Sequence, residues 1–481
     1  MGGHHSRSLP TPGEEVNFNH FQVLRAIGKG SFGKVCIVEK GERSGKMYAM
    51  KYVHKIECAS RGALKNVTRE VEIMSKLEHP FLVNLWFSFQ DEEDLFMVTD
   101  LLLGGDLRYH IQQQVQFSEE SVILFIAEIA LALDYLKSKR IIHRDIKPDN
   151  ILLDEEGHAH VTDFNVATML EDDQLATSIS GTKPYIAPEI YMCSCEVHGV
   201  FQPGYGYSVD WWSLGILAWE TLEGVRPFPI HAGTSYKEAL RILQDCKPVQ
   251  PTEWSQPMSE LLNSLLTLDP NQRLTTLCQL KQLEIMNNLD FDQIYLKKLK
   301  PKFTPSKNHL NCDPTFELEE MIIEARPLHK KKKRLAKQRS LRSQELADQI
   351  ESPAMMANGP TSSIFTQDPT GLVFIPDFPV YNRERELEQR LREEKEKQWE
   401  EELRIAMAES EKKLHLSRIP SDRDKQRSHN QHLRNSSRLS ISSSNIHSRS
   451  ERASLRSNKR SGIATSLDID FIDSGPETST S

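Results

Sequence analysis

The pattern of hydrophobic and polar positions divides the chain into a β-rich part and a mostly helical part. Near the start, three runs are β-branched or alternate between apolar and polar residues, which predicts strands over residues 21–28, 34–40 and 47–53. Apolar residues recur at helical spacing over 65–77, and residues 95–103 form another strand-like run. The first hundred residues are therefore expected to form a small β-rich unit.

After Gly104 and Gly105 the hydrophobic spacing becomes mostly helical. Residues 118–137 predict a long helix, and residues 210–222 predict a helix that is apolar on nearly every side, as expected of a helix buried in a core. A small β-rich unit followed by a larger helical one predicts an α+β fold.

Beyond residue 280 the composition changes. Residues 328–342 are strongly basic, residues 383–413 are rich in Glu, Arg and other good helix formers, and residues 414–464 are rich in Ser, Arg and Asn. The last of these segments holds too few apolar residues to offset the entropy of ordering a chain, which favours disorder.

Composition and charge exclude several classes of protein. Of the 481 residues, 38% are hydrophobic and 27% are charged, which is enough apolar sequence for a core. The net charge of −8 argues against a protein that coats nucleic acid, and we expect no nucleic-acid partner. Seven scattered cysteines indicate free thiols in a reducing compartment. No stretch reaches the ~20 apolar residues that cross a bilayer, and no secretory signal begins the chain, so we expect a cytoplasmic protein.

A glycine-rich segment, GKGSFG at residues 28–33, lies between the first two predicted strands. Glycines let a backbone pass close to phosphate groups and expose N–H donors to them. A tight hairpin needs glycines equally, so this segment alone leaves both interpretations open. A dinucleotide-binding fingerprint is disfavoured because a strand follows the last glycine where that fingerprint has a helix.

Lys51, on the third predicted strand, and Glu70, on the first predicted helix, have complementary charges. A lysine beside a phosphate-binding loop needs a counter-charge to hold it in place, and Glu70 is the candidate. Each residue alone is as well explained by a solvated surface.

The segment IIHRDIKPDNILLD at residues 141–154 carries the strongest chemical signal. Asp145 is placed to orient a hydroxyl and accept its proton, and Lys147 to neutralise a moving phosphoryl group. Asn150 and Asp163 supply oxygen ligands for a hard cation such as Mg²⁺. A chance match to H-R-D-x-K-x-x-N, followed thirteen residues later by D-F, is very improbable.

Together these segments resemble the eukaryotic protein kinases over residues 21 to about 281, and within them the AGC group. The stretches GKGSFGKVCIV, HPFLVNLW, LLLGGDLRYH, DFN and GTKPYIAPE are similar to the YANK ("yet another novel kinase") serine/threonine kinases, as is LNCDPTFELEEMI at 310–322. The resemblance implies a two-lobed fold and transfer of the γ-phosphoryl group of ATP to Ser and Thr hydroxyls of protein substrates. It also implies Mg²⁺ as the metal, with Mn²⁺ as the alternative.

The resemblance implies a division of the chain and roles for single residues. We divide the chain into a mobile arm (1–20), a small lobe (21–101), a large lobe (102–281), a tail with the basic run (282–342) and a mostly disordered tail (343–481) with a charged helix at about 383–413. The implied catalytic residues are Asp145, Lys147, Lys51 and Glu70, and the implied metal ligands are Asn150 and Asp163. The implied nucleotide contacts are Ile27, Gly28, Lys29, Gly30, Ser31, Phe32, Gly33, Lys34, Val35, Lys51, Asp100, Leu102 and Asp106.

Further matches concern support of the catalytic loop. Glu189 in A-P-E is expected to pair with Arg273, and Asp210 to bind the backbone of the catalytic loop. By resemblance, Thr182 flanks Asp145, Thr99 is the gatekeeper, and a hydrophobic spine is formed by Met74, Leu85, His143 and Phe164.

Two departures from the family pattern affect conformation and substrate choice. Asn165 replaces the usual glycine of D-F-G, which we expect to make an inactive flip of this segment harder. Lys183 brings positive charge near the substrate groove, whereas acidic residues match positions that relatives use for basic substrates: Asp106, Asp149 and Glu220. Because these signals conflict, the sequence assigns no substrate motif.

Regulation is suggested at two places. Ser178 aligns with the activation-loop phosphosite, with Arg144 as the phosphate partner, although Glu171 and its acidic neighbours make phosphate-independent activity an alternative. Phe378 and Tyr381 match loosely the aromatic spacing of the AGC hydrophobic motif. Docking of this pair into the small lobe and an apolar patch in a disordered tail are both open.

A membrane association is suggested by two further features. The start MGGHHS fits N-myristoylation of Gly2. Because one acyl chain anchors only marginally, the basic run Lys330 to Arg334 is a candidate second signal, toward an anionic membrane. A solvated helix face or a nuclear-import patch explains the run equally well.

Two rival functions were weighed against an active kinase. A pseudokinase would lack the lysine, the base or a metal ligand, yet all five residues are present. A membrane scaffold that acts through the tail would survive loss of catalysis.

Overall fold

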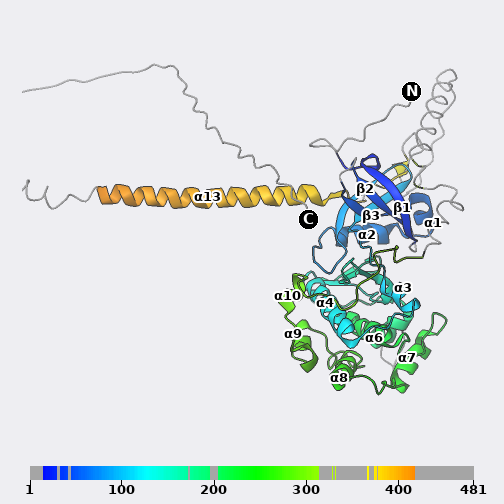
Figure 1. Ribbon diagram of the computed structural model, residues 1–481. Coiled ribbons are helices and arrows are strands. Elements are labelled where there is room, and N and C mark those ends of the chain that lie inside the picture. Colours follow the sequence, from blue (N-terminus) through cyan, green and yellow to red (C-terminus); the bar gives the residue numbers. More distant parts are fainter. Residues whose placement is uncertain are drawn as a thin grey trace, which may run out of the picture. The chain divides into compact units, whose positions relative to one another are not determined.

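The computed structural model describes residues 15–29, 33–41, 45–171, 174–194, 204–313, 328, 331, 366–367, 373–375 and 378–417. The chain separates into a unit that ends at Lys395 and a unit that begins at Glu396. The first unit contains both lobes, with strands gathered at one end and helices at the other (Figure 1).

An antiparallel six-stranded sheet forms the small lobe, in the order β1-β2-β3-β5-β4-β12. Its strands are β1 (Phe21–Lys29), β2 (Lys34–Lys40), β3 (Met47–His54), β4 (Leu85–Gln90), β5 (Asp94–Thr99) and β12 (Tyr381–Asn382). The first three coincide with the runs predicted from β-branched and alternating residues. In the register of β2 and β3, Val35 lies opposite Lys51, which places this lysine next to the glycine-rich turn.

Two helices, α1 (Lys55–Ser60) and α2 (Leu64–Met74), pack on the small-lobe sheet. The residues of α2 that repeat at helical spacing are buried, among them Val67, Val71 and Met74. Glu70 lies on the same buried side of α2, which turns its carboxylate toward the sheet and away from solvent.

The arm expected at residues 1–20 ends earlier than predicted. A short 3₁₀ helix, η1 (Phe18–His20), is capped by Asn17, and the Phe18 ring stacks on Phe96 with centroids 5.2 Å apart. Val16 and Phe18 are buried in the small-lobe core. The sequence pattern missed this segment because two apolar residues in a polar stretch carry no periodicity. Residues 1–14, with Gly2, lie outside the described residues.

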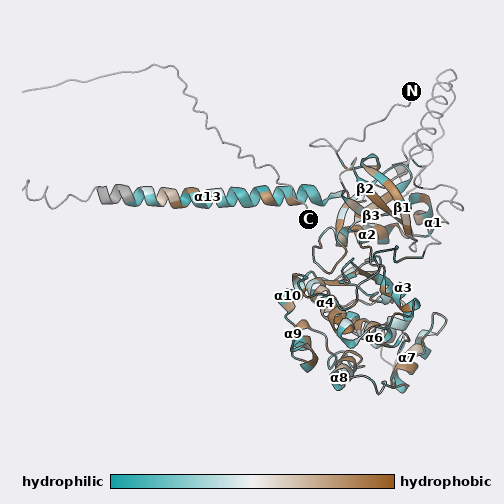
Figure 2. Ribbon diagram, viewed as in Figure 1, coloured by the Kyte–Doolittle hydropathy of each residue, from teal (hydrophilic) through white to brown (hydrophobic). Residues whose placement is uncertain are grey.

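The large lobe is helical, with α4 and α6 at its centre. Its helices are α3 (Leu107–Gln112), α4 (Glu119–Ser138), α5 (Pro188–Met192), α6 (Ser208–Glu223), α7 (Tyr236–Asp245), α8 (Gln256–Leu265), α9 (Leu277–Lys281) and α10 (Phe291–Tyr295). Hydrophobic residues concentrate on α4 and α6 (Figure 2). Gly215 of α6 sits so close to α8 that an added Cβ would lie 2.9 Å from the Cβ of Leu265.

The large lobe also contains two small β-ladders and three 3₁₀ turns. The ladders pair β6 (Ile141–Ile142) with β9 (Thr168–Met169) and β7 (Ile151–Leu153) with β8 (Ala159–Val161). The turns are η2 (Pro148–Asn150), η3 (Lys183–Tyr185) and η4 (Glu284–Met286). Because β6 and β7 flank residues 143–150, the segment with the strongest chemical signal is a loop held at both ends.

A distant part of the chain completes the small lobe. Strand β12 pairs with β4, and the Ser88 hydroxyl donates to the carbonyl of Pro379 at 2.7 Å. Ile375 and Phe378 are buried. Of the two interpretations of the Phe378–Tyr381 pair, the structure favours docking into the small lobe.

Helix α13 (Arg383–Ser417) follows β12 and covers the segment for which a charged helix was expected. Its first turns contact the small lobe: the side chain of Glu384 binds Lys46 at 3.1 Å and also Lys40. The part of α13 from Glu396 onward belongs to the second unit, and its large apolar side chains are exposed, namely Trp399, Leu403, Ile405 and Met407. A separate hairpin pairs β10 (Thr366–Gln367) with β11 (Val373–Phe374).

Two residues of the basic segment 328–342 are described, and both are buried in the small lobe. The ammonium of Lys331 lies 3.0 Å from Asp91, contacts Asp94, and sits over the Phe96 ring. The other members of Lys330 to Arg334 lie outside the described residues.

Two features bear on the expected compartment. Within the described ranges, no helix has the length and hydropathy that crossing a membrane requires. All the cysteines in these same ranges are free thiols.

Candidate active site

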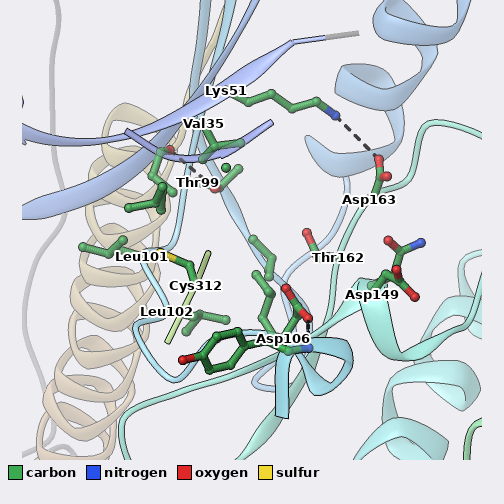
Figure 3. Close-up of a pocket in the computed structure, with 18 of the residues that line it drawn as sticks. Val35, Lys51, Thr99, Leu101, Leu102, Asp106, Asp149, Thr162, Asp163 and Cys312 are labelled. Carbon is green, nitrogen blue, oxygen red and sulfur yellow. Dashed lines mark hydrogen bonds and ion pairs between the residues drawn. The ribbon is translucent and has the colours of Figure 1, made fainter. Parts of the chain in front are cut away.

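An ion pair and a second carboxylate meet at the floor of the cleft between the lobes. The Lys51 ammonium donates to both oxygens of Glu70 at 2.7 and 3.0 Å, as predicted, and lies 3.6 Å from Asp163 (Figure 3). Burial opposes the charge on Lys51, but the carboxylates of Glu70 and Asp163 outweigh it and raise the pKa above its ordinary value. Burial raises the pKa of Glu70, against the pull of Lys51. We take the pair as ionised, because Lys51 remains protonated throughout the physiological range.

The catalytic loop aims Asp145 at the cleft. Its carboxylate accepts hydrogen bonds from Lys147 at 2.7 Å, from the Thr182 hydroxyl at 2.7 Å and from the Asn150 amide at 2.9 Å. Burial acts to raise the pKa of Asp145, but the charge of Lys147 and the hydrogen bonds from Lys147 and Thr182 hold it below its ordinary value. Asp145 is therefore an ionised hydrogen-bond acceptor at neutral pH.

Asp210 fixes the backbone of the catalytic loop. Its two carboxylate oxygens accept the backbone N–H groups of His143 and Arg144 at 2.8 and 2.7 Å, as the sequence indicated. Arg144 has a left-handed backbone, with φ of 68°, so the turn needs such an external support. The ring of Phe164 packs edge-on against His143, with centroids 5.0 Å apart.

Two side chains at this site suit a divalent cation. Asp163 Oδ1 is buried and has no hydrogen-bond partner, although it faces Lys51 at 3.6 Å. The amide nitrogen of Asn150 donates to the backbone oxygen and the carboxylate of Asp145, so its amide oxygen is the atom that a cation would meet. A carboxylate and an amide oxygen match the ligands of hard cations.

The expected effect of Asn165 on an inactive flip stays a prediction, and the structure shows what this residue does in one conformation. The left-handed backbone, with φ of 64°, occurs at Asp163 and not at Asn165. The tolerance of asparagine for positive φ is therefore unused in this conformation. The Asn165 amide instead donates to Asp163 Oδ2 at 3.3 Å, which helps orient that carboxylate.

A cavity of about 590 Å³ lies between the lobes, with Lys51, Asp163 and Asn150 on its wall. Most of the residues expected to contact a nucleotide line it: Ile27, Gly28, Val35, Lys51, Asp100, Leu102 and Asp106. Figure 3 shows Val35 and Leu102 on opposite sides of the cavity, with Lys51 and Asp163 at its far end. A slot with apolar walls that leads to a lysine and to candidate oxygen ligands of a cation suits a nucleotide, whose base is flat and whose phosphates bind lysine and divalent metal.

The glycine-rich turn is described in part. An added Cβ on Gly33 would lie 2.3 Å from the Tyr52 carbonyl, so the close approach of this turn to β3 requires glycine. Lys29 and Lys34 are in β1 and β2 but are not among the residues that line the cavity. Gly30, Ser31 and Phe32 lie outside the described residues.

The connection between the lobes is fixed by Asp100. Its carboxylate accepts from the Trp86 ring nitrogen at 2.6 Å and from the Asn84 amide at 2.8 Å, which ties the side chain away from the slot. Thr99 and Leu102, which lie on either side of Asp100 in the sequence, both line the slot. Asp106 lies beyond them, and burial raises its pKa to about 6.

Tail residues that sequence reasoning did not include also line the cavity, namely Leu310, Asn311, Cys312 and Asp313. The Asn311 amide donates to the Leu103 carbonyl at 3.0 Å and to the Ser306 carbonyl at 2.9 Å. An added Cβ on Gly105 would lie 2.1 Å from the Asn311 carbonyl, so Gly105 is what lets the tail approach. The resemblance of residues 310–322 to one kinase family was the available signal.

The activation segment contacts the catalytic loop through Ser178. The Arg144 guanidinium donates to the Ser178 hydroxyl at 2.6 Å and to the Tyr205 hydroxyl at 3.1 Å. At the end of the segment, Glu189 pairs with buried Arg273 at 2.7 Å, as predicted. Asp172 and Asp173 lie outside the described residues.

Comparison with known proteins decides the family. The protein kinase domain model matches residues 21–286. This chain is a protein kinase. Human serine/threonine-protein kinase 32B is 57% identical over 342 residues, which cover 71% of this kinase and 81% of that protein. Human serine/threonine-protein kinase 32C is 52% identical over 374 residues, which cover 77% and 73% of the two chains.

More distant relatives include human ribosomal protein S6 kinase alpha-2, which is 36% identical over 314 residues, or 63% of this kinase and 41% of that protein. The kinase therefore belongs with the YANK-type serine/threonine kinases, with AGC kinases as further relatives, as its motifs predicted. As a member of this family it is an enzyme that uses ATP and a divalent metal and acts on protein substrates.

Proposed function

We propose that the kinase transfers the γ-phosphoryl group of ATP through the roles that follow. Asp145 positions the substrate hydroxyl and accepts its proton, and Lys147 stabilises the charge that develops on the transferred group. Lys51, held by Glu70, fixes the nucleotide phosphates. The observation that carries this assignment is the Asp145 carboxylate, which is ionised and accepts hydrogen bonds from Thr182 and from two residues that line the cavity, Lys147 and Asn150.

Asn150 and Asp163 are the proposed ligands of Mg²⁺, with Mn²⁺ as the alternative. When bound, the cation neutralises phosphate charge during transfer. Two observations support the assignment. Asp163 Oδ1 has no hydrogen-bond partner, and the Asn150 amide nitrogen donates to Asp145, which leaves the Asn150 amide oxygen to bind a cation.

Phosphoryl transfer from γ-labelled ATP to serine, threonine and tyrosine peptides tests this assignment. Asp145→Asn is expected to lower kcat by about 10²–10⁴-fold while nucleotide binding persists. Asp163→Asn is expected to remove the metal dependence of nucleotide binding, measured by thermal shift with ATP at increasing Mg²⁺ or Mn²⁺. Unchanged turnover in Asp145→Asn, or preferred transfer to tyrosine, would contradict the proposal.

We also propose control by phosphorylation at Ser178. The contact of its hydroxyl with Arg144 places a phosphate on that residue beside the guanidinium of a catalytic-loop residue, which also donates to the Val166 carbonyl. Ser178→Ala is expected to lower turnover, and wild-type turnover in this variant would favour phosphate-independent activity.

For location, we propose a cytoplasmic kinase that associates peripherally with anionic membrane through acylated Gly2 and the basic run. Lys331 is held by carboxylates of the small lobe, so the charge available to lipid would come from its neighbours in the run. Gly2→Ala is expected to shift the kinase from the membrane fraction to the soluble fraction. An unchanged distribution would contradict the proposed membrane association.

A further inference from the structure

Arg108, on α3, lies where a protein substrate approaches the catalytic loop. It lines the same cavity as Lys147, Asn150 and Asp149. Asp149 lies between Lys147 and Asn150 in the chain, and Figure 3 shows it beside the catalytic end of the cavity. Lys147, which donates to Asp145, and Arg108 line the same cavity, so a peptide bound along this wall would meet Arg108.

The Arg108 guanidinium makes four hydrogen bonds to acidic and hydroxyl partners. It donates to both oxygens of Glu220 at 3.0 and 3.2 Å, a bidentate arrangement, and to Asp149 at 3.3 Å. It also donates to the Tyr185 hydroxyl, which in turn donates to Glu220. The Glu220 side chain is only 5% exposed behind Arg108, whose own side chain is 23% exposed.

The carboxylates of Glu220 and Asp149 have cationic partners within the chain. Arg226 lies 3.8 Å from Glu220, so two arginines face these two carboxylates. The third acidic residue nearby, Asp106, has a pKa that burial raises to about 6. A lysine or arginine of a substrate would have to displace Arg108 to reach Glu220. Displacement would break a bidentate pair and leave a guanidinium without its partners, which opposes binding.

Lys183 does not neutralise these carboxylates. Its ammonium donates to the carbonyls of Ala232 at 2.6 Å and Thr234 at 2.9 Å, and it lies over the Tyr236 ring. None of these contacts of the Lys183 ammonium is with an acidic residue. The conflict between the acidic and basic signals in the sequence is therefore resolved by Arg108 and not by Lys183.

We propose that Arg108 is a specificity-determining residue that fills, from within the chain, the carboxylate site that a cationic substrate side chain would otherwise occupy. The kinase then phosphorylates serine or threonine flanked by uncharged or acidic residues at least as well as sites flanked by arginine or lysine. This inference rests on the proposed role of Asp145, because the path of the peptide is defined by that residue.

The test compares kcat/KM for serine peptides in which each flanking position is in turn Arg, Ala or Glu. For the wild-type full chain, the ratio of Arg to Ala peptides is expected at or below one at every position. In Arg108→Ala the ratio is expected to rise about tenfold at one position or more, the worth of a single hydrogen bond to a charged group. Arg108→Gln, which can still donate to Glu220, is the second variant and should change the ratio in the same direction.

The double variant Arg108→Ala/Glu220→Gln is the matched control, and it is expected to lose most of the gained preference for arginine. Because each ratio is measured on one enzyme preparation, a lower folded fraction in a variant does not change it. A wild-type preference for arginine of about tenfold or more, or an unchanged ratio in both single variants, would overturn the inference. Failure of the wild type to phosphorylate any peptide would overturn the proposed role of Asp145 and the inference with it.

Discussion

Two arginine–glutamate pairs of the large lobe share one geometry and differ in their surroundings. Arg273 donates to both oxygens of Glu189 at 2.7 and 3.0 Å, and Arg108 donates to both oxygens of Glu220 at 3.0 and 3.2 Å. The Arg273 side chain has no exposed surface. Its remaining donors bind backbone carbonyls of Thr267, Ser208 and Leu268. Arg108 is partly exposed and lines the cavity.

The difference shows that access, and not the ion pair itself, separates a structural role from a functional one. The closed pair fastens α5, at the end of the activation segment, to the turn before Arg273. The open pair instead places a partly exposed guanidinium on the wall of the cavity. Lys51 and Glu70 form an open pair of the same kind in the small lobe, since both residues line the cavity and the Lys51 side chain is partly exposed.

The closed pair is expected to matter for stability. Arg273→Met leaves the Glu189 carboxylate buried without its partner, and we expect it to lower the free energy of unfolding by about 3–5 kcal/mol. Denaturant unfolding measures the effect. Arg273→Met/Glu189→Leu should recover part of the loss, because it removes the orphaned charge. If the single variant lowered the free energy of unfolding by less than about 1 kcal/mol, this pair would contribute no more than an exposed ion pair does.

The open pair in the small lobe is expected to matter for catalysis. Lys51→Met removes the charge that holds the phosphates, and kcat is expected to fall by about 10²–10³-fold. Its midpoint of thermal unfolding should fall less than that of Arg273→Met. A Lys51→Met enzyme that turns over normally, or one that unfolds more readily than Arg273→Met, would end the distinction between open and closed pairs.

Sequence reasoning reached both of these pairs because their members lie in segments of fixed chemistry. The run around Asp145, the lysine on the third strand and Glu189 in A-P-E each have a recognisable context. The strands β1–β3 and the helix α4 followed from period and composition. Such patterns predict the part of the fold in which the local preference for helix or strand agrees with the tertiary packing.

The contacts that sequence reasoning missed all join distant segments without a motif. Arg108 and Glu220 are 112 positions apart, and nothing in the spacing of α3 indicates a partner on α6. Lys331 meets Asp94 from 237 positions away. The sequence left two interpretations of Phe378 open because its burial depends on the edge that β4 leaves open for β12. Long-range pairing of this kind is decided by the assembled surface and not by local preference.

A pH dependence distinguishes Asp106 from the paired carboxylates. Asp106 accepts the backbone N–H of Tyr109 at 2.7 Å, and its pKa is raised to about 6, mainly by burial. Its ionised fraction therefore rises about tenfold between pH 5 and pH 7. Ionised Asp106 accepts hydrogen bonds from ribose better than the protonated acid, so the KM for ATP is expected to fall, by up to about tenfold, as pH rises through this range. In Asp106→Asn the profile should be flat, and an unchanged profile would assign the titration to another group.

The smallest effect is expected for an arginine–glutamate pair at the surface, in which Glu78 keeps a second partner, Arg383, when Arg390 is removed. Arg390 of α13 binds Glu78 at 2.8 Å, but both side chains are 47% exposed. Solvent screens such a pair, so Arg390→Ala is expected to change the free energy of unfolding by less than about 1 kcal/mol.

Phe378→Ala is the matched control on the same docked segment, because it removes a buried ring. We expect it to lower the free energy of unfolding by about 3 kcal/mol or to undock the segment, which would be seen as new protease cleavage before β12. If Arg390→Ala destabilised the kinase as much as Phe378→Ala, exposure would not be the property that ranks these pairs.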